Sequence, residues 1–166
     1  MSGKITDNKS RPSGLIKSAA VSGGKVLQSV MGTSTTASAG TETDWTDTGL
    51  NVTITPSATT SKIFVQATTT SKQPTGDAYL YFTIERQVSG GSDTNLGDST
   101  FGLNFTEGDT NYNVSIYPMY CHILDSPSTT SAITYEFQRK HETGVSSAGA
   151  MYQDQKGVII ATEVGA

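Results

Sequence analysis

The sequence contains a single cysteine, Cys121, and no apolar run that approaches the ~18 residues of a membrane-spanning helix. One cysteine cannot form a disulfide within the chain, so the fold does not require an oxidising compartment. No apolar segment of the signal-peptide type follows Met1. We therefore expect a protein that is made in the cytoplasm and does not insert into a membrane.

Charged residues are also scarce, at 16% of the chain, and the formal net charge is −4. The basic residues do not cluster, and their only gathering is the thinly spaced set Lys4, Lys9, Arg11 and Lys17. Proteins that bind nucleic acids usually carry a basic patch that neutralises phosphates. The sequence therefore predicts no nucleic-acid partner.

Residues that perform catalysis or hold metals are few. The chain has two histidines, His122 and His141, which is too few for a histidine-rich metal centre. Cys121 and His122 are adjacent, so in a strand they point to opposite faces and cannot form a nucleophile–base pair. No Gly-x-Ser-x-Gly, phosphate-loop or dinucleotide-binding pattern occurs. We expect no catalytic residues, no metal site and no cofactor, and therefore a protein that is not an enzyme.

Residues with hydroxyl side chains are abundant, whereas charged and hydrophobic residues are scarce. Thr and Ser together make up 46 of the 166 residues, whereas hydrophobic residues make up only 34%. Thr is β-branched and suits the half-buried surface of a pleated sheet. The 17 glycines supply turns. This composition indicates an all-β protein with a neutral, hydroxyl-rich exterior.

Residues 1–23 lack a sustained hydrophobic period and end at a Gly pair. We interpret them as an extended N-terminal arm, for which the alternative is a terminus without fixed structure. Apolar residues punctuate this polar segment, which favours docking on a partner. The candidate docking residues are Ile5, Arg11, Leu15, Ile16 and Lys17.

From Lys25 onward, apolar and polar residues alternate with a period of two. The alternation predicts that Val26, Gln28 and Val30 share one face. In the stretch "LNVTITPSATTSKIFVQA", Pro56 ends one strand before another begins, which predicts a hairpin or a corner. The apolar positions predicted to share strand faces are Leu50, Val52 and Ile54; Ile63, Val65 and Ala67; Ile133, Tyr135 and Phe137; and Val158, Ile160 and Val164.

Two further strands carry residues that need explanation. In residues 78–88, Arg86 falls on the same face as Leu80, Phe82 and Ile84, and we favour a strand-end side chain with a solvated head over a buried ion pair. In residues 112–124, His122 falls on the face of Tyr120 and Leu124, and we expect it in the core. Pro118 predicts an edge strand or a bulge there. "MYQD" at residues 151–154 is a candidate short strand.

Together these segments predict eight or nine strands and no helix of useful length. Alternation of apolar and polar residues, rather than continuous apolar runs, is typical of antiparallel sheets with one solvent-exposed face. We therefore predict a single antiparallel β-sandwich, or a jelly-roll-like fold, over residues 24–166.

Three tyrosines are predicted on outward strand faces: Tyr79, Tyr81 and Tyr117. Such tyrosines stack on sugar rings in lectin-like sites, pack around the axis of an oligomer, or form ordinary cross-strand pairs. The sequence leaves these three interpretations open, so the tyrosines are candidate oligomer or glycan contacts.

Four stretches resemble small virion proteins of tailed bacteriophages, many of them from marine phages and described as tail-fibre or structural proteins. They are "GGKVLQSV", "DTGLNVTITPSATTSKIFVQ", "LDSPSTTSAITYEFQ" and "IIATEVGA", and "RPSGLIKS" resembles the segment before the β domain. The resemblance implies a β-sandwich, oligomers that are often homotrimers, and no catalytic residues. It implies a place on the virion surface, with capsid or tail proteins as partners.

Two roles are compatible with this resemblance. The favoured one is a capsid-decoration, head-fibre or fibre subunit that docks through its N-terminal arm. The alternative is a receptor-binding tail-fibre module for host attachment, which recognises a glycan on the host surface.

Overall fold

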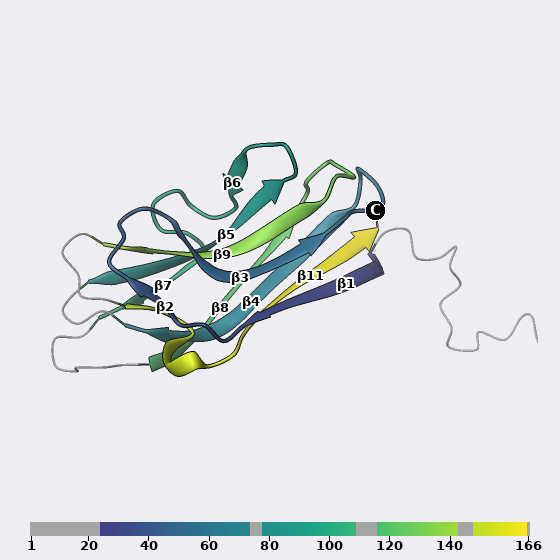
Figure 1. Cartoon of the computed structure of the whole chain (residues 1–166). Coiled ribbons are helices and arrows are strands. Elements are labelled where there is room, and N and C mark those ends of the chain that lie inside the picture. Colours follow the sequence, from purple (N-terminus) through teal and green to yellow (C-terminus); the bar gives the residue numbers. More distant parts are fainter. Residues whose placement is uncertain (1–23, 74–77, 109–115, 143–147, 166) are drawn as a thin grey trace, which may run out of the picture.

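The computed structural model describes residues 24–73, 78–108, 116–142 and 148–165 of the chain. These residues form eleven strands in two facing sheets, and every pairing between the strands is antiparallel. The predicted antiparallel β-sandwich is therefore confirmed (Figure 1). The predicted arm, residues 1–23, lies outside the described residues.

Sheet A forms the lower layer of Figure 1 and sheet B the upper layer. Sheet A contains β1 (Lys25–Ser34), β11 (Gly157–Gly165), β4 (Lys62–Lys72) and β8 (Ile116–Asp125), extended by β10 (Ala148–Ala150) and β2 (Ser38–Gly40). Sheet B contains β3 (Thr46–Ile54), β9 (Ile133–His141) and β5 (Tyr79–Val88), with β6 (Asp93–Asn95) and β7 (Asn104–Glu107) both paired to β5. The expected number of strands was too low because β2, β6 and β10 have three residues each and show no apolar alternation.

The core lies between the sheets and contains the alternating residues that the sequence indicates. The inward side chains of β3, β4, β5 and β9 are at most 5% exposed: Leu50, Val52, Ile54, Ile63, Val65, Ala67, Leu80, Phe82, Ile84, Ile133, Tyr135 and Phe137. The rings of Phe82 and Phe137 stack with centroids 5.3 Å apart. Burying a large side chain of this kind stabilises the fold by about 1.5–3 kcal/mol, so these faces dominate its stability.

The stretch around Pro56 is a corner rather than a hairpin. β3 ends at Ile54 in sheet B and β4 starts at Lys62 in sheet A, so the chain crosses between layers. The amide of Ser61 donates to the carbonyl of Ala58 at 3.1 Å and tightens the turn. The sequence allowed both outcomes, because a Pro-terminated strand does not show which sheet the next strand joins.

The prediction for the start of β1 is wrong. The register with β11 shifts between Val26 and Gln28, which marks a bulge, and Val26 is 58% exposed. A bulge adds a residue to one strand and reverses the alternation beyond it. Val26 consequently joins Met31 on the outer face, while Gln28 turns inward and donates to the Glu163 carboxylate at 2.6 Å.

The prediction for His122 is also wrong. In β8 the inward residues are Met119 and Cys121, whereas His122 is exposed and Tyr120 is 60% exposed. Both faces of this strand carry apolar residues, so alternation alone does not show which face meets sheet B. The edge position predicted from Pro118 is confirmed, since among the described strands β8 pairs only with β4.

Two local predictions need correction. Arg86 does not place its head in solvent, because its Nη1 lies 2.8 Å from Oδ1 of Asp125 across the sandwich. The alternative of a buried ion pair is therefore the one observed. Residues Tyr152–Asp154 form a 3-10 turn and not a short strand, with Gln153 and Asp154 at positive φ.

Within the described ranges, no helix is long and apolar enough to span a membrane.

Candidate functional site

The outer face of sheet B is hollowed where β5 and β7 pair. Tyr79 and Tyr81 are two residues apart in β5 and point to the same outer face, and Phe105 of β7 lies opposite Tyr81. Phe101 enters from the loop before β7, and Glu142 follows the last residue of β9. These five residues line a hollow of about 380 Å³, which we call the aromatic pocket.

The four aromatic rings pack against one another in one cluster. Tyr79 and Tyr81 are nearly parallel, with centroids 5.9 Å apart and planes inclined by 17°. Phe105 meets Tyr79 at 71° and 5.7 Å, and Phe101 meets Tyr81 at 61° and 5.8 Å. These steep contacts are favourable edge-to-face pairs. Phe101 and Phe105 remain 58% and 51% exposed, so they offer apolar surface to a ligand.

The loop that carries Phe101 is held by its own hydrogen bonds. The amides of Thr100 and Phe101 both donate to Oδ1 of Asp98 at 2.8 Å. These donors lower the pKa of Asp98 below its usual value. Gly102, with φ of 69°, closes the loop through backbone hydrogen bonds to Asp98 and lies against the carbonyl of Phe82. Phe101 is therefore fixed in position over the sheet.

Trp45 attaches this loop to the rest of sheet B. Its indole nitrogen donates to the carbonyl of Ser99 at 3.1 Å. The ammonium of Lys140 lies 4.7 Å from the Trp45 ring centroid and 5.5 Å from that of Tyr81. Both distances are within the range of cation–π attraction. In Figure 1, β6 and its loop lie above β5, on the outer side of the upper layer.

Two carboxylates lie near the tyrosines of the pocket. The hydroxyl of Tyr79 donates to Glu107 at 3.1 Å, and this hydrogen bond and charge raise the pKa of Tyr79. Burial, followed by the charge of Glu142, raises the pKa of Tyr81. The backbone amide of Glu142 donates to the carbonyl of Tyr79 at 3.0 Å. This hydrogen bond fixes the backbone of Glu142 beside the pocket.

The three predicted tyrosines do not form one surface. Tyr79 is partly exposed and Tyr81 is only 8% exposed, because β7 and the two phenylalanines cover it. The expectation that Tyr81 is exposed is therefore wrong. Tyr117 is 49% exposed but belongs to β8 in sheet A, apart from the other two. The candidate docking residues Ile5, Arg11, Leu15, Ile16 and Lys17 lie outside the described residues.

Sequence reasoning missed most of the pocket. Phe101 and Phe105 lie in residues 99–111, whose sequence pattern predicts only a short irregular strand, and Glu142 lies in residues 141–150, whose pattern predicts a loop. The pairing of β7 with β5 brings Phe105 to Tyr81 across 24 positions of sequence. The available signal was two phenylalanines within a mainly polar stretch. They indicate an apolar surface, but they do not indicate which strand that surface packs against.

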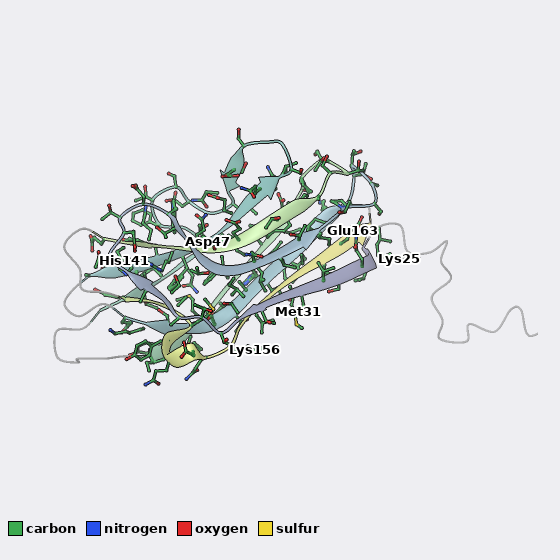
Figure 2. All side chains as sticks on the ribbon, viewed as in Figure 1. Lys25, Met31, Asp47, His141, Lys156 and Glu163 are labelled. Atoms are coloured by element: carbon green, nitrogen blue, oxygen red, sulfur yellow. The ribbon has the colours of Figure 1, made fainter. Side chains whose placement is uncertain are left out.

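The outer face of sheet A is a second unusual surface, because several of its most exposed residues are large and apolar. Cross-strand neighbours continue across the sheet: Met31 lies beside Ile160, and Phe64 beside Leu124. Figure 2 shows Met31 projecting from β1 on the lower, outer side. The most exposed members are Met31 at 64%, Tyr120 at 60%, Val26 at 58% and Leu124 at 52%. We call this surface the sheet A face, with members Val26, Met31, Phe64, Tyr120, His122, Leu124 and Ile160.

The middle of the sheet A face carries no described carboxylate. His122 lies 6.5 Å from the ring centroid of Tyr120 and 6.3 Å from that of Phe64. Lys62 and Lys72 stand at the two ends of β4. Ser29 and Thr162 share a 3.0 Å hydrogen bond between their hydroxyls on the same face. Large apolar side chains that are exposed together on one face are typical of surfaces that another protein covers.

Reactive side chains are protected from solvent. Burial raises the pKa of Cys121 to about 12, so its thiol stays protonated at neutral pH. His141 is 2% exposed, and burial together with the Arg139 charge lowers its pKa. In the part of the chain that the structure describes, no three His, Cys, Asp or Glu side chains gather to hold a metal ion.

No family model matches the chain, and no curated protein sequence matches it. Among solved structures, 82% of the chain aligns with a chain from the crystal structure of the T13 IBDV viral particle. The identity is 9%, the TM-score is 0.40, and the aligned part covers 37% of that viral chain. A TM-score below 0.5 carries no argument about function.

Proposed function

We propose that the chain is a non-enzymatic structural subunit on the surface of a tailed-phage virion, present as a homotrimer or another small homo-oligomer. The observation that carries this proposal is the sheet A face. Exposed Met31, Tyr120 and Leu124 lie on this one face, which also carries the exposed polar residues Gln66 and Thr68 of β4. A surface of this kind is stable in water when a partner covers it, and a second copy of the chain is the occupant that we propose.

The charge distribution supports self-association. Two copies can appose the middle of the sheet A face without burying a carboxylate, because the described residues there are apolar or hydroxylated, apart from Gln66 and His122. Lys62 and Lys72 lie at the ends of β4, where a rim tolerates charge. β1 and β8 are also edge strands of sheet A, and contacts between copies would protect them from unwanted pairing.

The place on the particle is supported by the resemblance to small virion proteins and by a compact β fold with a single buried cysteine. In this proposal, residues 1–23 attach the sandwich to capsid or tail proteins. Deletion of residues 2–17 should leave a folded protein that no longer joins particles in a complementation assay. Incorporation of the truncated protein at the wild-type level would refute the anchoring role.

Light scattering coupled to size-exclusion chromatography tests self-association. The purified chain should have the mass of a small oligomer, and Leu124→Asp should shift it to monomer because a buried carboxylate disfavours association. Phe101→Asp is the matched control, since Phe101 is similarly exposed on the opposite sheet and should leave the mass unchanged. A wild-type chain that is monomeric at all working concentrations would contradict the proposal.

A second candidate function is host attachment through a surface glycan, and the aromatic pocket is the observation that favours it. Its stacked Tyr79 and Tyr81 and exposed Phe101 and Phe105 are of the residue types that bind small ligands. Purified protein should then bind host cells and compete with phage adsorption. Absence of cell binding at micromolar concentration counts against host attachment. It does not bear on the proposed role as a structural subunit of the virion.

A further inference from the structure

We propose that the aromatic pocket binds one neutral pyranose residue of a glycan, with the apolar face of the sugar ring against the exposed rings of Phe101 and Phe105. The inference deepens the second candidate function and depends on it only for the biological source of the sugar. The binding chemistry follows from the pocket itself.

The size and shape of the pocket agree with a single sugar ring. Its volume of about 380 Å³ is at the lower end of the range for small-molecule sites, which is about 300–1,000 Å³. Tyr79 and Tyr81 stack with centroids 5.9 Å apart, and Tyr81 is only 8% exposed, so the accessible apolar surface belongs mainly to Phe101 and Phe105. A pyranose has a flat face of C–H groups that matches such a surface. Phe101 and Phe105 are steeply inclined to the tyrosines and both line the hollow, so they can contact this C–H face.

The exposure of the pocket residues distinguishes binding surface from simple packing. Tyr81 is held below by its neighbours at 8% exposure, which makes it a rigid floor. Phe101 and Phe105 are more than half exposed, although a loop fixed by Asp98 and a strand position hold them there. Rigid aromatic groups lose little conformational entropy when a ligand binds. Pre-organised apolar surface of this kind favours a weak ligand such as a sugar.

The charges around the pocket select a neutral ligand. Glu142 lines the pocket and Glu107 accepts the hydrogen bond of Tyr79, so two carboxylates disfavour an anionic sugar. A cationic ligand is disfavoured as well, because the Lys140 ammonium already lies 5.5 Å from the Tyr81 ring. Sugar hydroxyl groups, in contrast, donate to the Glu142 carboxylate and accept from the Lys140 ammonium. A neutral sugar is the ligand class that uses all of these groups.

The test is saturation-transfer NMR with the full chain and a panel of defined sugars. The neutral probes are methyl α-glucopyranoside, methyl β-galactopyranoside and N-acetylglucosamine, the anionic probe is N-acetylneuraminic acid, and the cationic probe is tetramethylammonium. We expect transfer to at least one neutral sugar, with a dissociation constant on the order of 1 mM, and none to the charged probes. Trp45 reports the same titration, because it contacts Lys140 and the pocket loop.

Variants connect the signal to the pocket. Phe105→Ala and Glu142→Gln should each lower the affinity by about tenfold, and neither residue is buried, so the fold should be retained. Tyr117→Ala is the matched control, an exposed tyrosine of sheet A that should leave binding unchanged. Three outcomes overturn the inference: no transfer from any neutral sugar, unchanged binding in both pocket variants, or tighter binding of a charged probe. Incorporation of Phe105→Ala into particles is scored separately, so failure of the pocket is distinguishable from failure of the structural role.

Discussion

Arg86 and Asp125 join the two sheets: Nη1 of Arg86 in β5 lies 2.8 Å from Oδ1 of Asp125 in β8. The other carboxylate oxygen of Asp125 accepts the Tyr135 hydroxyl at 2.8 Å, and the amide of Ser126 donates to Oδ1 at the same distance. Burial, and then the hydrogen bond to Asp125, raise the pKa of Tyr135 far above its ordinary value. These hydrogen bonds to Asp125 compensate for placing a charged pair at the inner edge of an otherwise apolar core.

Removal of the carboxylate should destabilise the sandwich strongly. Asp125→Ala leaves the guanidinium of Arg86 and the hydroxyl of Tyr135 without their partner, and we expect a loss of about 2–4 kcal/mol, reduced from the fully buried case because Arg86 is 20% exposed. Urea denaturation followed by fluorescence measures it. Asp44→Ala, at an exposed carboxylate, is the control. A change below about 0.5 kcal/mol in Asp125→Ala would show that the pair contributes nothing.

Glu163 should make stability sensitive to acid. It is 0% exposed in β11, and although burial alone would raise its pKa, hydrogen bonds from Ser57, Ser61 and Gln28 lower the pKa from 4.5 to about 2. A lowered folded pKa means that the ionised form stabilises the fold above the unfolded pKa, and that this part is lost as pH falls from about 4.5 toward 2.

Glu163→Gln measures this contribution. At neutral pH the variant should be less stable by about 1–3 kcal/mol, because charge-assisted hydrogen bonds to buried groups are lost. The difference between wild type and variant should shrink as the pH is lowered toward 2. Chemical denaturation over a pH series gives both quantities. A difference that does not depend on pH would contradict the cause assigned to the lowered pKa.

Two like charges face each other on the outer side of sheet B. Glu85 and Glu136 are directly opposite in the β5–β9 register. Burial, followed by neighbouring carboxylates, raises the pKa of both. An acid with a raised folded pKa costs stability as pH rises from its unfolded pKa through its folded pKa, so the cost is fully present at neutral pH.

Glu136→Gln should therefore stabilise the protein at neutral pH, by about 0.2–1 kcal/mol. The gain should vanish at acidic pH, where the wild-type pair is protonated. Thermal unfolding at the two pH values checks this, and Glu142→Gln serves as a control for removing one acidic charge elsewhere on the same sheet. Destabilisation at neutral pH would show that Glu136 makes a favourable contact that outweighs the repulsion.

Gly32 allows β1 to approach β3 of the opposite sheet. A Cβ at this position would collide with the backbone carbonyl of Asn51. Because backbone does not move aside easily, Gly32→Ala should destabilise the fold by about 1–3 kcal/mol. Gly165→Ala is the control, since its Cβ would meet only the flexible Leu27 side chain at 3.3 Å. Equal melting temperatures for the two variants would contradict this account.

The sequence predicted the strands of the core well and the surfaces poorly. Leu50, Leu80 and Phe137 alternate with polar neighbours, and each lies where the period of two places it. Val26 and His122 were misplaced for two different reasons. A bulge shifted the first, and an apolar outer face made the second ambiguous. The aromatic pocket required the pairing of β7 with β5, which no local pattern contains.

The sequence by itself determined that the chain folds into antiparallel strands, because a period of two in apolar residues divides each strand into two unlike faces. Only the tertiary structure decided which face is covered, since β8 carries apolar residues on both sides and the partner sheet selects Met119 and Cys121. It also decided that Phe105 meets Tyr81 and that Arg86 meets Asp125. These contacts join residues distant in sequence, so they depend on how the strands are ordered and not on the pattern within any one of them.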